Sequence, residues 1–304
     1  MIRIGTRGSD LALYQTRKVQ SFLRSESEYE VVETSGDRSQ DRFDSKVAEI
    51  GGQGVFVREI DARVSDGDFD AAVHSMKDMP VERPEGVEVA AVLKRDTPND
   101  VLVSTDGKEI DDLGHGAVIG TSSQRRRAQI KRYRDDLNVQ GLRGNVDTRI
   151  DKLRRGDYDA VVLSGAGLER MDIDIPSVKL SLSEFVPSAN QGVIAVTARD
   201  ETDEFEEIRG IDHPKTRVET TAERVVLAEI GAGCVAPMGV YARIKGEHIE
   251  ITAEVLSLDG EEEVRVEDKI PVESYYEGAQ EVADEMVDRG AVELVEEATR
   301  DENK

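Results

Sequence analysis

The pattern of apolar and polar positions predicts strands and helices in alternating order. Ile2 and Ile4 alternate with polar residues at the start of the chain, and short apolar runs cover 71–73 and 160–163. Runs of that length beside Gly-Asp turns are typical of buried strands. Strands that alternate with helices imply βαβ units and mainly parallel sheets, and such sheets bind ligands beyond the carboxyl ends of their strands.

Two pairs of segments indicate an internal duplication. IGTRGS at 4–9 resembles IGTSSQ at 119–124, and each follows an apolar strand and precedes a helical pattern. GDFDAAVHS at 67–75 resembles GDYDAVVLS at 156–164. We therefore expect two copies of one α/β unit with a cleft between them. Chance similarity is the alternative, because Gly-Asp turns before apolar runs are common.

The rest of the chain predicts a return to the first sheet and then a third domain. The apolar run VIAVTA at 193–198 follows the second copy and can pair with the first sheet. A helix is predicted at 221–230, strands at 240–244, 249–258 and 263–270, and helices over 277–297. The expected domains are 1–96 with 190–212, then 97–189, and a small α+β domain at 213–304.

The charge of the chain excludes some classes of partner. The formal net charge is −24, and 34% of the 304 residues are charged, against about 25% in ordinary domains. Periodic apolar residues favour a folded protein over a disordered one, and acid runs such as DETDEFEE at 200–207 suit concentrated salt, which screens self-repulsion. A halophilic source is expected. Nucleic acid is an unfavourable partner, because its phosphates need a cationic surface.

Few residues are available for metal or disulfide chemistry. The chain has one cysteine, which excludes an internal disulfide, and four scattered histidines, so no metal-ligand spacing can be assembled from His and Cys and no metal is expected. The apolar stretches are shorter than the roughly 20 residues of a membrane span, and no signal sequence opens the chain. A cytoplasmic protein without a membrane partner is expected.

Positive charge is concentrated in one segment of this acidic chain. Residues 118–155 contain eleven Lys or Arg and four Asp. Arg125, Arg126 and Arg127 fall in the first turn of a helix capped by Ser122 or Ser123, where the helix dipole disfavours cations unless an anion is bound. Arg143 and Arg149 flank a turn at 144–145 and offer planar forks for carboxylates. The alternative is a solvated helix face with ordinary salt bridges.

The first copy offers an equivalent site. Arg7 and Ser9 lie in the loop after the first strand, where free backbone N–H groups can hold an anion. Lys77 and Asp78 follow the buried strand in HSMKD at 74–78, at the edge where ligands bind, although adjacent Lys and Asp are common in surface turns. His74 is expected to face the core rather than to act as a base.

The single cysteine lies in a Gly-rich loop. Cys234 is part of GAGC, just after a predicted helix end, which favours an accessible thiol. The alternative is a small buried hydrophobic residue. Residues 36–58 contain four glycines among polar residues and predict either a segment that covers the cleft or a plain surface loop.

Six ordered motifs identify the family that the chain resembles. GTRGSDLAL, GGQGVFVRE, AVHSMKDMP, IGTSSQRR, GLRGNVDTR and GAGCVAPMG are similar to those of hydroxymethylbilane synthase, also called porphobilinogen deaminase, over nearly the whole chain. The resemblance implies two similar α/β domains of type II periplasmic-binding-protein-like fold around a cleft, with a small α+β C-terminal domain. The family members are transferases of tetrapyrrole (haem-type) biosynthesis.

The resemblance also implies a reaction and roles for individual residues. Four porphobilinogen molecules are joined head to tail into linear hydroxymethylbilane, with release of ammonia, on a dipyrromethane cofactor that Cys234 holds through a thioether. Asp78 is the implied catalytic residue, which holds pyrrole N–H groups, stabilises the cationic azafulvene formed when ammonia leaves, and assists proton transfers as a base. The implied cofactor ligands are Ser75, Lys77, Thr121, Ser123, Arg125, Arg126, Arg143 and Arg149, and the substrate ligands are Arg7, Ser9 and Arg170.

Two positions depart from the family pattern. Glu49 and Gln53 stand where many bacterial relatives carry lysines, so a role of this segment in holding the growing chain is in doubt. We expect a monomer that acts on porphobilinogen. The alternatives are a non-catalytic two-domain protein that binds a polycarboxylate small molecule, and an interaction protein that uses its acidic surface.

Overall fold

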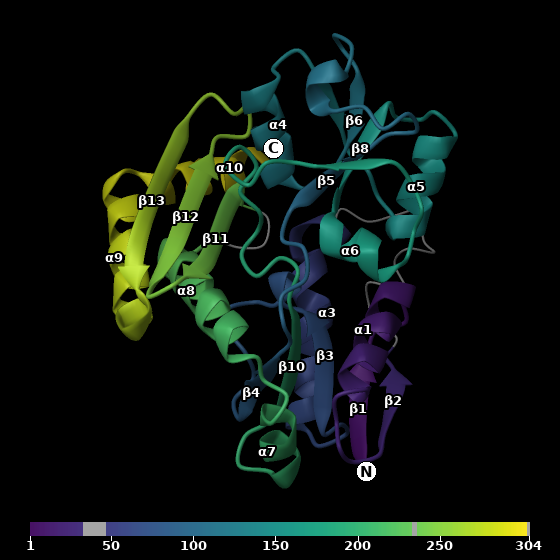
Figure 1. Ribbon diagram of the computed structural model, residues 1–304, viewed down its shortest axis with the longest axis vertical. Coiled ribbons are helices and arrows are strands. Elements are labelled where there is room, and N and C mark those ends of the chain that lie inside the picture. The colour runs from purple at the N-terminus through teal and green to yellow at the C-terminus, as the bar shows by residue number, and fades with distance from the viewer. Residues whose placement is uncertain (33–46, 233–235, 303–304) are drawn as a thin grey trace. The chain divides into compact units, whose positions relative to one another are not determined.

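The computed structural model describes residues 1–32, 47–232 and 236–302, without the side chains of 47–53 and 301–302 (Figure 1). The chain divides into two compact units. The first comprises Met1–Asp96 and Gly192–Arg217, and the second Thr97–Gln191 and Val218–Lys304. The three domain boundaries drawn from the sequence stay a prediction.

The first unit is a five-stranded sheet with helices on both faces. Its elements are β1 (Ile2–Thr6), α1 (Asp10–Gln20), β2 (Ser27–Val31), α3 (Val47–Ser65), β3 (Ala71–Ser75), the 3-10 turn η1 (Met76–Asp78), β4 (Val87–Val92), β10 (Ile194–Arg199) and α7 (Asp203–Arg209). The strand order is β2-β1-β3-β10-β4, and β10 is antiparallel to both neighbours. The apolar run at 193–198 therefore returns to the first sheet as predicted, and it is antiparallel in a sheet whose strands β1, β2 and β3 are parallel.

The second unit contains a sheet of the same design. Its elements are β5 (Asp100–Val103), the 3-10 turn η2 (Ile110–Asp112), β6 (Val118–Gly120), α4 (Gln124–Tyr133), β7 (Asn138–Gln140), α5 (Val146–Arg154), β8 (Ala160–Ser164), α6 (Gly165–Arg170) and β9 (Ser177–Lys179). The order β7-β6-β8-β5-β9 repeats the first sheet strand for strand, with β5 antiparallel in the place of β10. The predicted duplication and fold class are confirmed.

The two copies also agree in detail at the turn before the third strand of each. Gly67 ends α3 and Gly156 ends α5, with φ of 84° and 82°, which a glycine adopts without steric cost. The Gly67 N–H donates to the Val64 carbonyl at 3.1 Å, and the Gly156 N–H to the Leu153 carbonyl at 2.9 Å. Residues 89 positions apart are therefore structurally equivalent from these helices into β3 and β8.

The C-terminal part is a three-stranded antiparallel sheet covered by helices. Its elements are α8 (Pro214–Ile230), which begins in the first unit, β11 (Met238–Lys245), β12 (His248–Leu256), β13 (Glu263–Pro271), the 3-10 turn η3 (Val272–Ser274), α9 (Tyr275–Asp288) and α10 (Ala291–Glu302). Buried residues of α8, α9 and α10 share one apolar core with the three strands. The α+β prediction is confirmed, but α8 begins seven residues earlier than expected.

Helix α4 packs closely on the hairpin between β12 and β13. Gln129 Nε2 donates to Glu254 Oε1 at 2.8 Å, and Arg265 Nη1 donates to Glu254 Oε2 at 2.9 Å. A Cβ atom at Gly260 in the turn would lie 2.6 Å from the Ala128 carbonyl oxygen. Burial raises the pKa of Glu254, although Gln129 and Arg265 oppose the rise. The second α/β sheet and the C-terminal sheet are thus joined by buried polar contacts.

The aromatic residue of each GD-aromatic-D motif packs on a glycine of the neighbouring strand. A Cβ at Gly5 would lie 2.6 Å from the Phe69 ring, and a Cβ at Gly120 would lie 2.8 Å from the Tyr158 ring. The rings and the glycines thus form the same contact in both copies. This contact explains why both residue types recur in the repeated segments.

We predict that Gly5→Ala destabilises the protein by about 1–3 kcal/mol, because the added methyl group overpacks the contact with Phe69. Chemical denaturation followed by circular dichroism measures the change. Gly114→Ala is the matched control, since a Cβ there has no atom within 4 Å. Equal stability of the two variants would contradict the close packing.

Candidate functional site

A pocket in the first unit lies beyond the carboxyl ends of β1 and β3. It encloses about 130 Å³ and is lined by the loop after β1, the first turns of α1, residues 56–57 of α3 and the end of β3 with the following turn. Arg7, Ser9, Ser75 and Asp78 are among its lining residues. The structure therefore brings together four of the predicted site residues.

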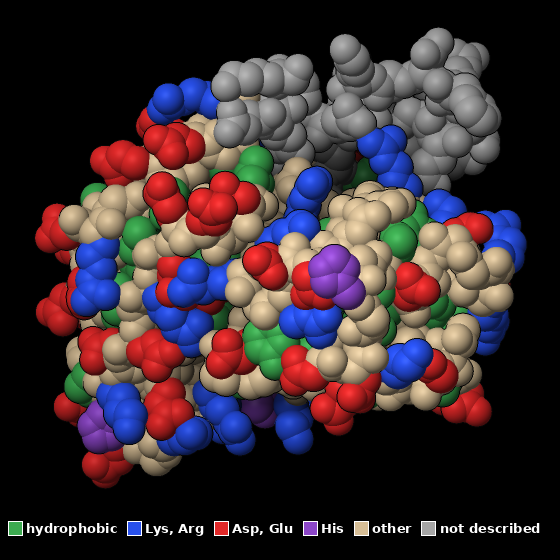
Figure 2. All heavy atoms as spheres, turned by 90° about the horizontal axis from the view of Figure 1, so that it is seen from above, with side chains coloured by type: hydrophobic (Ala, Val, Ile, Leu, Met, Phe, Trp, Pro, Cys, Tyr) green, Lys and Arg blue, Asp and Glu red, His purple; other side chains and the backbone are tan. Residues whose placement is uncertain are grey.

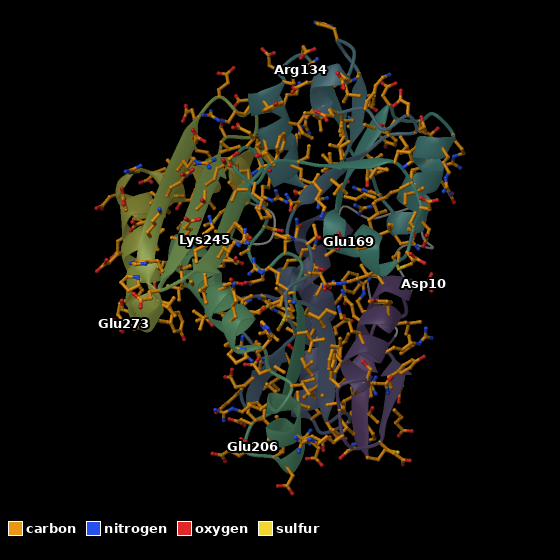
Figure 3. The ribbon with its side chains drawn as sticks, in the orientation of Figure 1. Asp10, Arg134, Glu169, Glu206, Lys245 and Glu273 are labelled. Atoms are coloured by element: carbon orange, nitrogen blue, oxygen red, sulfur yellow. The ribbon has the colours of Figure 1, made fainter. Side chains whose placement is uncertain are left out.

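The start of α1 and the side chain of Arg7 shape one wall of this pocket. Ser9 is the N-cap of α1, and its Oγ accepts from the Ala12 N–H at 3.3 Å. Asp10 occupies the first turn, where the helix dipole favours a carboxylate (Figure 3). The Arg7 guanidinium carbon lies 4.1 Å from the centroid of the Phe56 ring, which orients the cation.

Asp78 ends the short turn η1, half-buried, where it lines the pocket. The Met76 N–H donates to the Val193 carbonyl at 3.0 Å, which fixes this turn to the chain leading into β10. Lys77 is also half-buried but is not among the lining residues. At the equivalent position of the second copy, 89 residues later, stands Gly167. Only the first copy therefore has a carboxylate here.

The pocket also contains residues that sequence reasoning missed or placed elsewhere. Gln15 is 2% exposed and donates from Nε2 to Ser75 Oγ at 2.8 Å. The sequence could have indicated Gln15 as a site residue, because it lies on the inner face of the helix that follows Ser9. His74 is 5% exposed, as expected of a core-facing strand residue, and it nevertheless lines the pocket.

In the second unit, Arg125 and Arg126 share a buried carboxylate. Arg125 Nη2 donates to Asp100 Oδ2 at 2.8 Å, and Arg126 Nη2 donates to Asp100 Oδ1 at 2.7 Å. Gln191 Nε2 donates to Asp100 Oδ1 at 2.9 Å. The sequence predicted that cations at this helix start need an anion, and Asp100 supplies one. The alternative of a solvated helix face does not hold for these two arginines, which are 3% and 7% exposed.

The charges around Asp100 do not balance. Burial alone would raise the pKa of Asp100, but the two guanidiniums outweigh this effect and hold the pKa well below its usual range. One ionised carboxylate thus faces two cations. Arg125 Nη1 also donates to the Val186 carbonyl, and Arg126 Nη1 to the Val162 carbonyl. The buried Nε atoms of both arginines have no hydrogen-bond partner among the described residues.

The other predicted residues of this unit lie on two adjacent loops and a helix end. Ser122 joins the loops, because its Oγ donates to the Leu142 carbonyl at 2.8 Å and accepts from the Leu142 N–H at 2.9 Å. Thr121 is buried and Ser123 caps α4, whereas Arg143 is exposed. Arg149 is half-buried and donates from Nε to the Gly144 carbonyl at 2.8 Å. Arg170 ends α6 and is buried.

Some features fall outside what is described. Cys234 lies outside the described residues. So does most of the Gly-rich segment 36–58, including the side chains of Glu49 and Gln53. The described part of the chain contains no cluster of three or more His, Cys, Asp or Glu side chains suited to a metal ion. None of its helices is long and apolar enough to cross a membrane.

Comparison with known protein families accounts for both units. A family model described as the dipyrromethane cofactor binding domain of porphobilinogen deaminase matches residues 2–207, and one described as the C-terminal domain of porphobilinogen deaminase matches residues 217–288. The chain belongs to the porphobilinogen deaminase family. The family's activity is that of a transferase, and its cofactor is dipyrromethane.

Individual members of the porphobilinogen deaminase family match over nearly their whole length. A probable porphobilinogen deaminase of Methanosarcina acetivorans is 49% identical over 97% of this chain and 94% of its own. One of Halobacterium salinarum is 36% identical over 98% of each chain, and the porphobilinogen deaminase of Sulfurimonas denitrificans is 39% identical over 97% and 96%. These relatives include methanogens, so the family membership gives no support to a halophilic source.

Solved structures with a similar chain path are remote. A substrate binding domain of a putative amino acid ABC transporter from Streptococcus pneumoniae has a TM-score of 0.43 at 12% identity, covering 69% of this chain and 91% of that one. A probable amino-acid transporter binding protein from Bacillus subtilis has a TM-score of 0.38 at 11% identity, covering 69% and 89%. The strand orders, rather than these scores, establish the fold.

The residues of the second unit fit a dipyrromethane. Each pyrrole ring of this cofactor carries an acetate and a propionate, and Arg125 with Arg126 holds one more positive charge than Asp100 neutralises. Their buried Nε–H donors without described partners, together with the exposed Arg143, are the donors that carboxylates prefer. When bound, the cofactor supplies the pyrrole carbon to which the first substrate is joined.

We predict that Asp100→Asn lowers the free energy of unfolding by about 3–5 kcal/mol at neutral pH, because two buried arginines lose their shared counter-charge. The ionised carboxylate stabilises the fold above its ordinary pKa of about 4, and this contribution fades as the pH falls below that value. The difference from wild type should therefore shrink in acid. Urea denaturation over a range of pH measures it.

Asp157→Asn is the matched control for this change. Asp157 pairs with Arg155 at 3.3 Å in the same unit, but both side chains are about half exposed or more, so the pair should contribute little. A loss of stability as small in Asp100→Asn as in the control would contradict the structural role of the buried carboxylate.

Proposed function

We propose that this chain joins four porphobilinogen molecules head to tail into hydroxymethylbilane, on a dipyrromethane held by Cys234, with Asp78 as the catalytic carboxylate. The observation that carries the proposal is the pocket in the first unit, which combines Asp78 with Arg7, Ser9 and Ser75. A carboxylate suits a developing pyrrole cation, and an arginine suits the acid side chains of the substrate.

The pocket residues divide the work of binding and charge stabilisation. Arg7, oriented by Phe56, binds a substrate carboxylate, and Ser9 contributes the start of α1. Asp78 orients the pyrrole N–H groups and provides the counter-charge when the aminomethyl group leaves as ammonia. Gln15 fixes the hydroxyl of Ser75 through its hydrogen bond, and Ser75 is thereby held for a polar contact with the bound rings.

The cations of the second unit bind the acid side chains of the cofactor and of the growing chain. Arg143 is exposed, and its planar guanidinium suits a carboxylate of the growing chain. Arg125 and Arg126 are fixed by Asp100 and retain a net positive charge. Thr121, Ser123 and Arg149, with Lys77 of the first unit, complete the proposed cofactor ligands, and Arg170 is a proposed substrate ligand.

Mass spectrometry with two variants tests the proposal. Wild type expressed with porphobilinogen available should exceed its sequence mass by one dipyrromethane under denaturing conditions. Cys234→Ser should fold but lack this increment, because a hydroxyl is a far poorer nucleophile than a thiolate. Asp78→Asn keeps Cys234, and we expect its turnover to fall about 10²- to 10³-fold through loss of the counter-charge.

Asp10→Asn is the control for Asp78→Asn. Asp10 lies in the first turn of α1 beside the pocket but is not among its lining residues, so turnover should be retained. A bare sequence mass for wild type would refute the covalent cofactor and leave the binding-protein alternative. Normal turnover of Asp78→Asn would remove Asp78 from its assigned role.

We further propose that the protein is adapted to concentrated salt and acts as a cytoplasmic monomer without nucleic-acid or membrane partners. The net charge of −24 supports the adaptation. Figure 2 shows acidic and basic side chains spread over the face that it draws, with few apolar side chains between them. The excess of acids over the whole chain repels itself in dilute buffer, and salt screens the repulsion.

The melting temperature should therefore rise between about 0.1 M and about 2 M KCl, because screening relieves the repulsion among excess acids. Differential scanning calorimetry measures the rise. Sucrose at matched osmolality is the control, since it stabilises without screening charge. An equal melting temperature at both salt concentrations would contradict the adaptation.

A further inference from the structure

Three buried polar side chains meet behind the pocket of the first unit. Asp61 of α3, His74 of β3 and Thr197 of β10 are 1%, 5% and 0% exposed. Asp61 Oδ1 lies 2.8 Å from His74 Nε2 and accepts from Thr197 Oγ1 at 2.7 Å. Asp61 Oδ2 is buried without a hydrogen-bond partner among the described residues. We call these residues the buried trio.

The second copy shows that the fold does not need this trio. Ile150 and Leu163 stand 89 positions after Asp61 and His74. Thr197 pairs with Ala72 on β3, and Val103 pairs with the equivalent Val161 on β8. Ile150, Leu163 and Val103 lie in one apolar core cluster. The same three places are therefore polar in one copy and apolar in the other.

The free-energy cost of burying polar side chains makes this difference between the copies informative. Burial of a carboxylate with an imidazole has a desolvation cost, and apolar replacement of a buried ion pair is often neutral or stabilising. A buried oxygen without a partner adds to that cost. The apolar trio of the second copy is the less costly solution. Since the polar trio occurs in the copy that has Asp78, and His74 lines the pocket with Asp78, the difference points to the reaction.

We propose that His74, held by Asp61 and Thr197, accepts the proton that a pyrrole carbon loses in each condensation. This inference rests on the proposed function. Asp61 at Nε2 favours the form with a proton on that nitrogen and leaves Nδ1 as the basic site. A carboxylate behind the ring also stabilises the imidazolium that forms, as in other acid-histidine pairs.

The proton balance explains why Asp78 does not suffice. When ammonia leaves with the electron pair of the carbon–nitrogen bond, a cation forms on the substrate and needs an ionised Asp78 beside it. The new carbon–carbon bond takes its electrons from a pyrrole ring. The C–H bond at that carbon then breaks, its electrons return to the ring, and the proton moves to His74 Nδ1. His74 passes it on to the departing ammonia, so Asp78 stays ionised for the next addition.

The second copy supplies the test variant. Asp61→Ile, His74→Leu and Thr197→Val together install its apolar trio, and the protein should fold with an equal or higher melting temperature and carry the cofactor mass. We expect kcat to fall about 10²- to 10⁴-fold, the range for loss of a proton-transfer group. Porphobilinogen deuterated at its free ring carbon should slow this variant more than wild type, because proton removal has become rate-limiting.

Two further variants keep the test decisive. Asp61→Asn retains the shape and the acceptor for Thr197 but removes the charge behind His74, and it should show the same isotope effect if the triple variant fails to fold. Thr16→Val is the control. Thr16 is a buried hydroxyl of the same unit, hydrogen-bonded to Thr6 at 2.8 Å and not a pocket-lining residue, so kcat should be unchanged.

Several outcomes would overturn the inference. A folded, cofactor-loaded triple variant with the kcat of wild type would show that the trio has no part in the reaction. A reduced kcat without an increased isotope effect would remove the proton-acceptor role. Failure of wild type itself to consume porphobilinogen would instead refute the proposed function, so the two failures are distinguishable.

Discussion

The shared carboxylate of Asp100 is the interaction on which the second α/β sheet and its ligand-facing loops depend. It opens β5, the antiparallel strand of the sheet, and binds Arg125 and Arg126 at the start of α4. It also accepts from Gln191, near the point where the chain leaves this unit. All three donors are distant from Asp100 in the sequence. Their bonds to this one carboxylate therefore hold together the strand, the helix start and the segment where the chain leaves the unit.

The two copies of the α/β unit have kept one framework and diverged in chemistry. The glycine-aromatic contact, the glycine at the helix end and the strand order are common to both. The first copy has Asp78 and the buried trio where the second has Gly167 and apolar residues. The second copy has instead gained buried arginines around Asp100. Duplication thus gave one unit suited to stabilising a cation and one suited to holding anions.

Local patterns predicted the framework well because its signals are contiguous in sequence. The GD-aromatic-D segments located β3 and β8, and the alternation after Gly239 located the C-terminal strands. The sequence pattern placed the start of α8 at residue 221, which is too late. The helix begins at Pro214, and proline is well suited to the first helical position. The cation cluster at 125–127 was identified, but the burial of Arg125 and Arg126 was not, whereas Arg127 is exposed.

The missed features depend on contacts between distant residues. Asp100 lies 25 positions before Arg125, and nothing near it in sequence marks it as the partner of two arginines. The role of His74 depends on Asp61 and Thr197, which come from a helix and a strand far apart in the chain. Periodicity predicts which face of a strand is buried, but it does not predict which polar group from another element lies opposite.

The contact of α4 with the hairpin of β12 and β13 has a consequence for folding. Glu254 is 1% exposed and accepts from both Gln129 of α4 and Arg265 of β13, so separating the two sheets would break the bond to Gln129 and leave Arg265 as the partner of Glu254. The second α/β sheet and the C-terminal sheet each have an apolar core of their own, and this buried contact makes the stability of one depend on the presence of the other.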